Sequence, residues 1–118
     1  MHRPTAFQRT SRRMALKAWF RARPKQPMVS VHRGLWQAFP ENSLSAILAA
    51  RSWDVVEIDV QLDRDGTPYL MHDDTLARMT GDAHQVSAID ARHRETLRLK
   101  TGAGGASAPL TDEPVPTL

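Results

Sequence analysis

The sequence has 118 residues, of which 41% are hydrophobic and 25% charged, so it predicts one small globular domain and not a disordered chain. It contains no cysteine, which excludes a disulfide framework and a thiolate metal site and agrees with the cytoplasmic location that we expect. The net charge of +3 is uneven: residues 1–27 carry eight basic and no acidic residues, whereas residues 28–118 carry eight basic and thirteen acidic residues. The basic character belongs to this leader, so we do not expect the domain to bind nucleic acid.

The basic leader is predicted to contain one helix, from about Ser11 to Arg23, because Pro24 and Pro27 would stop it. The helix is amphipathic, with basic side chains opposite an apolar arc. The arc consists of Met14, Ala15, Ala18, Trp19 and Ala22. Residues 11–23 could make peripheral contact with an anionic membrane, but we favour packing of the arc against the domain. The sequence has no apolar run near the ~20 residues that span a bilayer and no secretory signal.

The domain is predicted to begin with a strand, a loop and a helix. Residues 28–32 alternate in polarity and predict a short strand, and residues 33–39 predict a loop. Asn42 or Ser43 is a suitable N-cap for a helix over residues 44–51. The apolar side chains expected to be buried by this helix are Leu44, Ile47 and Leu48.

Two further strands follow in the sequence. Residues 54–62 are rich in Val and Ile and predict the second strand, residues 63–66 predict a turn, and residues 69–72 predict the third strand. Residues 87–98 are weakly helical, and the Gly-, Ala- and Pro-rich residues 102–116 predict a loop. The β-α-β beginning indicates an α/β fold with a parallel sheet, either doubly wound or a barrel. A parallel barrel needs eight strands, so the pattern predicts that a C-terminal part of the fold is missing.

Chemically useful side chains fall at the ends of these predicted strands. His32 ends the first strand, and His72 ends the third. Glu57 and Asp59 are two residues apart on the second strand, so their carboxylates should point to the same face. Two such carboxylates repel each other unless a cation lies between them, and hard divalent ions are the natural occupants.

This set suits the attack on a phosphodiester. A metal ion would neutralise phosphate charge, while one imidazole removes a proton and the other protonates the leaving alkoxide. The guanidinium group of Arg33 could hold a phosphate oxygen. A single histidine at a strand end is more often a surface residue, and a Glu-x-Asp pair is often the solvent face of a strand, so the hypothesis depends on the combination. We assign no role to the other three histidines, which are His2, His84 and His93.

Four segments of the sequence resemble one family in order and spacing. They are His32–Gly34 (HRG), Pro40–Ser43 (PENS), Glu57–Val60 (EIDV) and His72–Gly81 (HDDTLARMTG). The final four residues, VPTL, are similar to the segment just before the third barrel helix of that family. On these motifs residues 28–118 resemble the glycerophosphodiester phosphodiesterase (GDPD) family.

The resemblance implies the N-terminal portion of a TIM (β/α)8 barrel, incomplete here, with a divalent metal ion, Mg²⁺ or Ca²⁺. It implies that Glu57 and Asp59 are metal ligands, that His32 and His72 are the catalytic acid and base, and that Arg33 contacts phosphate. Glu41 is also placed in the site by the family pattern. The implied reaction converts a small-molecule glycerophosphodiester to glycerol 3-phosphate and an alcohol. A further glutamate ligand of the family lies beyond residue 118.

The resemblance leaves several alternatives open. The chain could be a hydrolase that is truncated or split, an inactive remnant, or a phospholipase D-like relative that cleaves lipids. We therefore expect two parts, a basic leader in residues 1–27 and the truncated N-terminal part of a GDPD domain in residues 28–118. The activity of the 118-residue chain alone is expected to be far below that of a complete enzyme.

Overall fold

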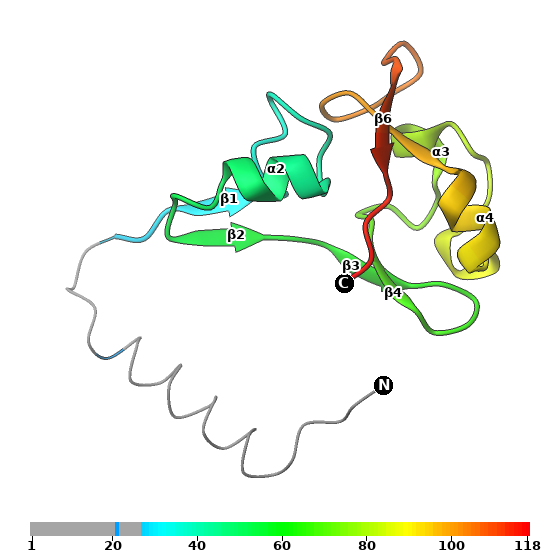
Figure 1. Cartoon of the computed structure of the whole chain (residues 1–118), viewed down its shortest axis with the longest axis horizontal. Helices are drawn as coiled ribbons and strands as arrows, with labels where there is room; N and C mark the ends of the chain where they lie inside the picture. Colours follow the sequence, from blue (N-terminus) through cyan, green and yellow to red (C-terminus); the bar gives the residue numbers. More distant parts are fainter. Residues whose placement is uncertain (1–20, 22–26) are drawn as a thin grey trace, which may run out of the picture.

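The computed structural model describes residue 21 and residues 27–118 (Figure 1). The predicted leader helix and its packing fall outside the described residues except for Arg21, so they stay predictions. In the described part of the chain, no helix is both long enough and apolar enough to cross a bilayer. The elements are β1 (Ser30–His32), α2 (Leu44–Ala49), β2 (Val55–Glu57), β3 (Val60–Leu62), β4 (Pro68–Leu70), α3 (Ala77–Thr80), the 3-10 helix η1 (Val86–Ala88), α4 (Ala91–Thr96), β5 (Arg98–Lys100) and β6 (Leu110–Pro114).

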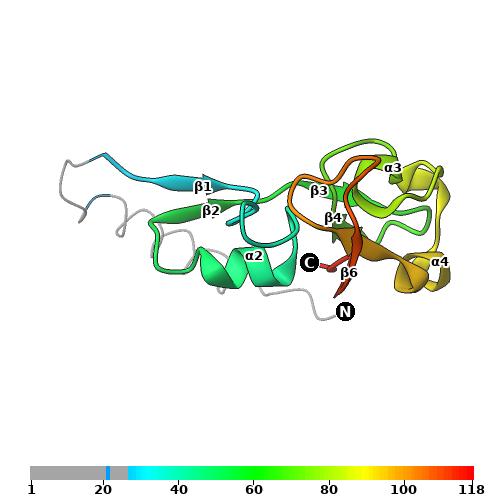
Figure 2. The ribbon, with the colours of Figure 1, turned by 90° about the horizontal axis from the view of Figure 1, so that it is seen from above.

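The first unit is the predicted β-α-β arrangement. Strands β1 and β2 are parallel, with His32 opposite Glu57 in the register. Figure 2 shows α2 lying along one face of this pair. Ser43 is the N-cap of α2, because its side chain accepts a hydrogen bond of 3.0 Å from the backbone N–H of Ala46. The predicted start of the helix is confirmed.

The predicted burial on α2 is wrong for Leu44 and Leu48, whereas Ile47 is half-buried. Leu44 and Leu48 are 56% and 50% exposed, whereas Ala46 and Ala50 are completely buried. Residues 46 and 50 are four apart and so share one helical face, and small side chains there allow close packing. Leu44 and Leu48, also four apart, share another face, which the described residues cover only in part.

The predicted second strand is divided into β2 and β3, with Ile58 and Asp59 between them. Strand β3 forms an antiparallel hairpin with β4. The turn is organised by Asp63, whose Oδ1 accepts hydrogen bonds of 2.9 Å from the backbone N–H groups of Asp65 and Thr67. The third strand therefore does not extend the parallel sheet, because a parallel connection needs a crossover of about a dozen residues and this turn is far shorter.

The rest of the chain forms a packed unit around this hairpin. Strands β5 and β6 are antiparallel, so the loop predicted for residues 102–116 contains a strand that sequence analysis missed. The helix predicted for residues 87–98 consists of η1 and α4, and Asp90 caps α4 by accepting a hydrogen bond from the N–H of His93. The buried cluster comprises Tyr69, Met71, Leu76, Met79, Val86, Ile89, Leu97, Leu99 and Val115.

The described strands form three two-stranded sheets and no closed barrel. The C-terminal end returns to β4, since Tyr69 bridges Thr117 and the N–H of Leu70 donates to the carbonyl of Pro116. The architecture is α/β, as predicted (Figures 1 and 2). The parallel pair β1–β2 with α2 lies at one end, and the antiparallel pairs with the buried cluster lie at the other.

Candidate active site

The parallel register of β1 and β2 brings two predicted site residues together at the carboxyl ends of the strands. His32 Nε2 lies 3.6 Å from Glu57 Oε2, and the two side chains are 63% and 42% exposed. The backbone N–H of Arg33 donates to the Glu57 carbonyl at 2.9 Å and also lies 3.3 Å from Glu57 Oε2. An imidazole and a carboxylate therefore face solvent at one strand edge.

The loop after β1 has an unusual backbone conformation. Arg33 and Asn42 are the described non-glycine residues with positive φ, at 58° and 56°, and the Asn42 N–H donates to the Arg33 carbonyl at 3.0 Å. Gly34 also has positive φ, and a Cβ there would lie 2.7 Å from the carbonyl carbon of Ala46. This sparsely populated geometry is typical of functional loops, and here it turns the Arg33 side chain back toward the acidic residues.

Asp59 is held by an amide and a guanidinium group. Asn42 Nδ2 donates to Asp59 Oδ2 at 2.9 Å, and the Asp59 N–H donates to Asn42 Oδ1 at 3.0 Å. Arg33 Nε lies 3.3 Å from Asp59 Oδ2, close enough for an ion pair, but it is buried and makes no hydrogen bond of good geometry. Both Glu57 and Asp59 therefore contact Arg33, one through its backbone and the other through its side chain.

Glu41 is the buried centre of the site, with a side chain only 3% exposed. Arg33 Nη1 lies 3.3 Å from Glu41 Oε2, and Arg78 Nη2 donates to Glu41 Oε1 at 2.6 Å. A buried carboxylate requires such partners, because its desolvation is otherwise very costly. Glu41 thus links the β1–β2 unit to the segment that carries α3.

The second predicted histidine lies on the far side of Arg78. Arg78 holds Asp73 with two hydrogen bonds of 2.8 Å, from Nε and Nη2, and His72 Nδ1 lies 2.9 Å from Asp73 Oδ1. The Arg78 hydrogen bonds hold the pKa of Asp73 far below its usual range, and the same contacts, with Glu41, raise the pKa of Arg78. An ionised carboxylate can only accept hydrogen bonds, so a neutral His72 carries its proton on Nδ1 and keeps Nε2 as its basic nitrogen.

Together these contacts form one network that runs from His32 to His72. It contains four carboxylates (Glu41, Glu57, Asp59 and Asp73) and two guanidinium groups (Arg33 and Arg78). With neutral histidines the network has an excess of two negative charges, and it would repel a phosphate anion. A divalent cation would cancel this excess.

The two predicted metal ligands have the chemistry of a hard-cation site. Glu57 and Asp59 offer partly exposed carboxylate oxygens. Within the described residues they belong to no group of three His, Asp or Glu whose ligand atoms all lie within 4.8 Å of one another. Mg²⁺ is usually held by one or two carboxylates, with water and phosphate oxygens completing its shell. Glu57 and Asp59 therefore offer part of such a shell.

Sequence reasoning missed one member of the network and two residues that support it. Arg78 lies in the HDDTLARMTG string but was given no role, and its five-residue distance from Asp73 was the available signal. Asn42 was considered only as a helix cap. Gln61 gave no signal at all, yet its Nε2 donates to the carbonyls of Met71, His72 and Asp73 and so positions that segment.

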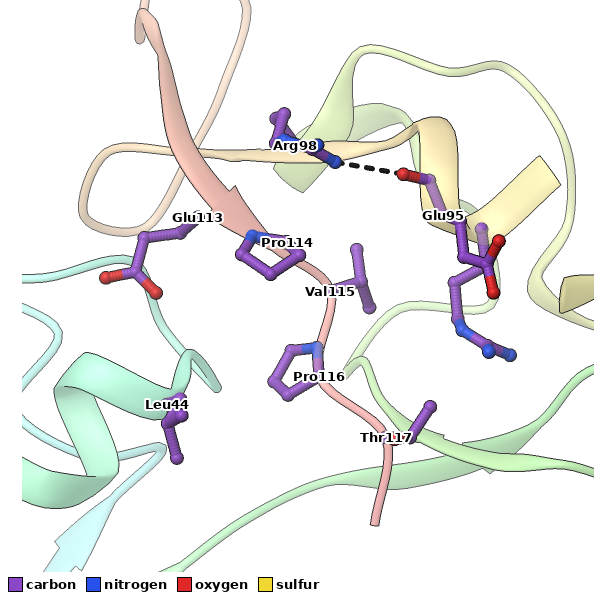
Figure 3. Close-up of a pocket in the computed structure, with 9 residues that line it drawn as sticks. Leu44, Glu95, Arg98, Glu113, Pro114, Val115, Pro116 and Thr117 are labelled. Atoms are coloured by element: carbon purple, nitrogen blue, oxygen red, sulfur yellow. Dashed lines mark hydrogen bonds between the residues drawn. The ribbon is translucent and has the colours of Figure 1, made fainter. Parts of the chain in front are cut away.

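A pocket of about 530 Å³ lies elsewhere in the structure (Figure 3). It lies between Leu44 at the start of α2, residues of α4, and the segment Glu113–Thr117. None of the predicted site residues lines this pocket.

Comparison with known proteins identifies the class. The model of the glycerophosphoryl diester phosphodiesterase family matches residues 32–118, and the chain belongs to this family. Over 90 residues the chain is 34% identical to glycerophosphodiester phosphodiesterase 1 of Rattus norvegicus, covering 74% of the chain and 27% of the rat protein. Over 87 residues it is 40% identical to glycerophosphoinositol inositolphosphodiesterase GDPD2 of Mus musculus, covering 67% of the chain and 16% of that protein.

Solved structures of phosphodiesterases are also similar to this chain. A glycerophosphodiester phosphodiesterase from Agrobacterium tumefaciens aligns with a TM-score of 0.67 and 31% identity, covering 79% of this chain and 40% of that one. An Oleispira antarctica phosphodiesterase in complex with the product sn-glycerol-3-phosphate aligns with a TM-score of 0.63 and 33% identity. The alignment covers 78% of this chain and 37% of the Oleispira chain. These relatives are TIM-barrel enzymes, which confirms the predicted fold family. The chain spans about a quarter of the length of the rat relative and about two fifths of the bacterial ones.

Proposed function

We propose that this chain carries part of the active site of a metal-dependent phosphodiesterase that converts glycerophosphodiesters to glycerol 3-phosphate and an alcohol. The observation that carries the proposal is the continuous network between His32 and His72, which lies entirely within the segment matched by the family model. It supplies two imidazoles for proton transfer and two guanidinium groups among carboxylates. Its excess negative charge favours a divalent cation, Mg²⁺ or Ca²⁺, as cofactor.

In this scheme the two histidines divide the proton transfers. One imidazole removes the proton from the attacking hydroxyl, which is the neighbouring glycerol hydroxyl if a cyclic phosphate forms first, and the other protonates the leaving alkoxide. Asp73 orients His72 and leaves its Nε2 available, whereas Nε2 of His32 faces Glu57. Glu41 and Asp59 hold the Arg33 guanidinium, whose role in this scheme is to contact a phosphate oxygen. A bound divalent ion would supply charge neutralisation on the phosphate oxygens.

We further propose that the isolated chain turns over slowly, well below an ordinary enzyme rate of about 10 s⁻¹. Exposed apolar side chains on α2, including Leu44 and Leu48, leave the β1–β2 unit with little packing to hold its half of the site. Misplacement of a reacting group by ~1 Å can cost about 10²-fold in rate. This observation favours weak over efficient catalysis by the chain.

The remaining parts of the proposal concern domain organisation, cellular location and binding partners. We propose that residues 1–27 form a basic leader and residues 28–118 the N-terminal part of the phosphodiesterase domain, that the protein acts in the cytoplasm, and that its partner is a small glycerophosphodiester and not a nucleic acid. Membrane contact through residues 11–23 is not favoured. Binding to anionic vesicles that is lost when residues 1–25 are deleted would overturn that last point.

The function is tested by the release of glycerol 3-phosphate from glycerophosphocholine, with the protein at high concentration and with Mg²⁺ or Ca²⁺. We expect slow, metal-stimulated release that falls at least tenfold in His32→Gln and in His72→Gln. Arg92→Gln, which changes an exposed residue of α4, is the control and should keep the wild-type rate. Release that is absent in the wild type, or equal in the wild type and both histidine variants, would contradict the proposal.

A further inference from the structure

A second cluster of metal-ligating side chains lies outside the candidate active site. It consists of Asp82, His84 and His93, whose ligand atoms all lie within 4.8 Å of one another. Asp82 Oδ1 lies 2.7 Å from His84 Nδ1, and Asp82 Oδ2 lies 2.7 Å from His93 Nε2. The two imidazole rings are in edge-to-face contact, with centroids 4.7 Å apart. No other such group of three occurs among the described residues.

The backbone holds the two halves of this cluster independently. The Asp82 N–H donates to Thr80 Oγ1, and the His84 N–H donates to Asp82 Oδ1 at 2.8 Å. The His84 carbonyl accepts from the N–H of Leu76, which ties the loop to the buried core. On the other side, His93 lies in the first turn of α4. The three ligands are thus positioned before any ion binds, which lowers the cost of binding.

The cluster has the donor set of a transition-metal site. Two imidazole nitrogens and one carboxylate oxygen suit Zn²⁺ and related ions, and they do not suit Mg²⁺, which prefers oxygen donors only. Each carboxylate oxygen of Asp82 lies 2.7 Å from an imidazole nitrogen, so the carboxylate stands between the two histidine ligands.

Access and proton balance also allow binding. The side chains of His84, His93 and Asp82 are 58%, 31% and 18% exposed, so an ion could enter and keep water on its open positions. When the rings are neutral, His84 Nδ1 and His93 Nε2 donate hydrogen bonds to the Asp82 carboxylate, which can only accept. On binding, each proton moves to the other ring nitrogen, and the freed lone pair coordinates the ion. No oxidant, reductant or net proton loss is required.

We propose that Asp82, His84 and His93 form a binding site for Zn²⁺ or a similar divalent transition-metal ion, distinct from the hard-cation site proposed at Glu57 and Asp59. The ion would join the loop after α3 to α4 and would stabilise the packed unit of the chain. The cluster shares no residue with the active-site network, and no hydrogen bond or ion pair among the described residues joins the two.

The test is calorimetric titration of the metal-free 118-residue protein with ZnCl₂. The wild type should bind one ion with micromolar or tighter affinity, and His84→Ala and His93→Ala should each weaken binding at least tenfold. The double variant His32→Ala/His72→Ala removes the active-site imidazoles and should bind Zn²⁺ as the wild type does. A wild type that binds no Zn²⁺, or binding lost in the double variant and kept in the two single variants, would overturn the proposal.

A second measurement separates loss of the site from loss of folding. The thermal midpoint of the wild type should rise with added Zn²⁺, since an ion that binds only the folded state stabilises it. His84 is the most exposed ligand, so His84→Ala should have the wild-type midpoint in EDTA but no rise with Zn²⁺. An equal rise in His84→Ala and the wild type would mean that the trio is only a hydrogen-bonded contact.

Discussion

The two ends of the molecule differ in how their side chains are held. Between residues 28 and 62 the buried hydrophobic side chains are the small Ala46 and Ala50, while Leu44 and Leu48 are at least half exposed. From residue 68 onward, nine side chains form a continuous buried cluster. The candidate site draws His32, Glu57 and Asp59 from the first region and His72, Asp73 and Arg78 from the second. In the first region it is therefore held mainly by polar contacts, and in the second it lies on a packed core.

The largest expected effect on the free energy of unfolding comes from truncating a buried leucine of the second region, compared with an exposed leucine of the first. Leu99→Ala removes a side chain that is 1% exposed and should lower the free energy of unfolding by about 3 kcal/mol. Leu48→Ala, the matched control in the first region, should change it by less than about 0.5 kcal/mol because Leu48 is already half exposed. Urea unfolding measures both. If Leu48→Ala cost as much as Leu99→Ala, the contrast between the two regions would not exist in solution.

The next largest effect on stability should come from Glu41, the carboxylate that joins the two regions. Glu41→Gln removes the buried charge between Arg33 and Arg78 and should lower the free energy of unfolding by about 2 kcal/mol. The effect is below that of a fully buried pair because Arg78 is 28% exposed and keeps Asp73 as a partner. Glu95→Gln, on the exposed surface of α4, is the control for loss of a carboxylate. No difference between these variants would mean that Glu41 does not bridge the regions.

The first region was the easier one to predict from sequence. The strand at residues 28–32, the Ser43 cap and the parallel partner of β1 follow from local patterns, and they suffice to bring His32 beside Glu57. The exposure of Leu44 was not predictable, because an apolar pattern identifies a face but not whether anything covers it.

The second region depends on contacts between distant parts of the chain. The short turn at Asp63 makes β4 run antiparallel to β3. The sequence predicted this turn, but we still expected the third strand to extend a parallel sheet. Arg78 reaches Glu41 across 37 residues of sequence, and no local spacing encodes that contact. Strand β6 lies in a segment whose Gly and Pro content argued for a loop, but pairing with β5 outweighs that weak preference.

The smallest effect is a dependence of stability on pH. The pKa of Asp73 is lower in the folded than in the unfolded state, mainly because Arg78 donates hydrogen bonds to the carboxylate. Its contribution is therefore fully present above the unfolded pKa of about 3.9 and is lost as pH falls from about 5 through the folded pKa. Asp73→Asn should cost about 1 kcal/mol at pH 7 and progressively less below pH 4.

Unfolding curves of the wild type and Asp73→Asn between pH 7 and pH 3 measure this difference directly. Subtracting the two curves removes the contribution of Asp82, whose pKa is also lowered. Asp65→Asn, in the exposed hairpin turn, is the control for loss of a carboxylate. A difference that grew as pH fell would contradict the assigned role of Arg78.

The central claim is that His32 and His72, one from each region, belong to a single site for a phosphate ester. Titration with sn-glycerol 3-phosphate in the presence of Mg²⁺, followed by the NMR signals of the five histidine rings, tests it most directly. Signals would be assigned with single His→Gln variants. The account predicts that the His32 and His72 signals shift with one common midpoint while those of His84 and His93 do not move. Shifts of His72 alone, of neither ring, or of both with different midpoints would contradict it.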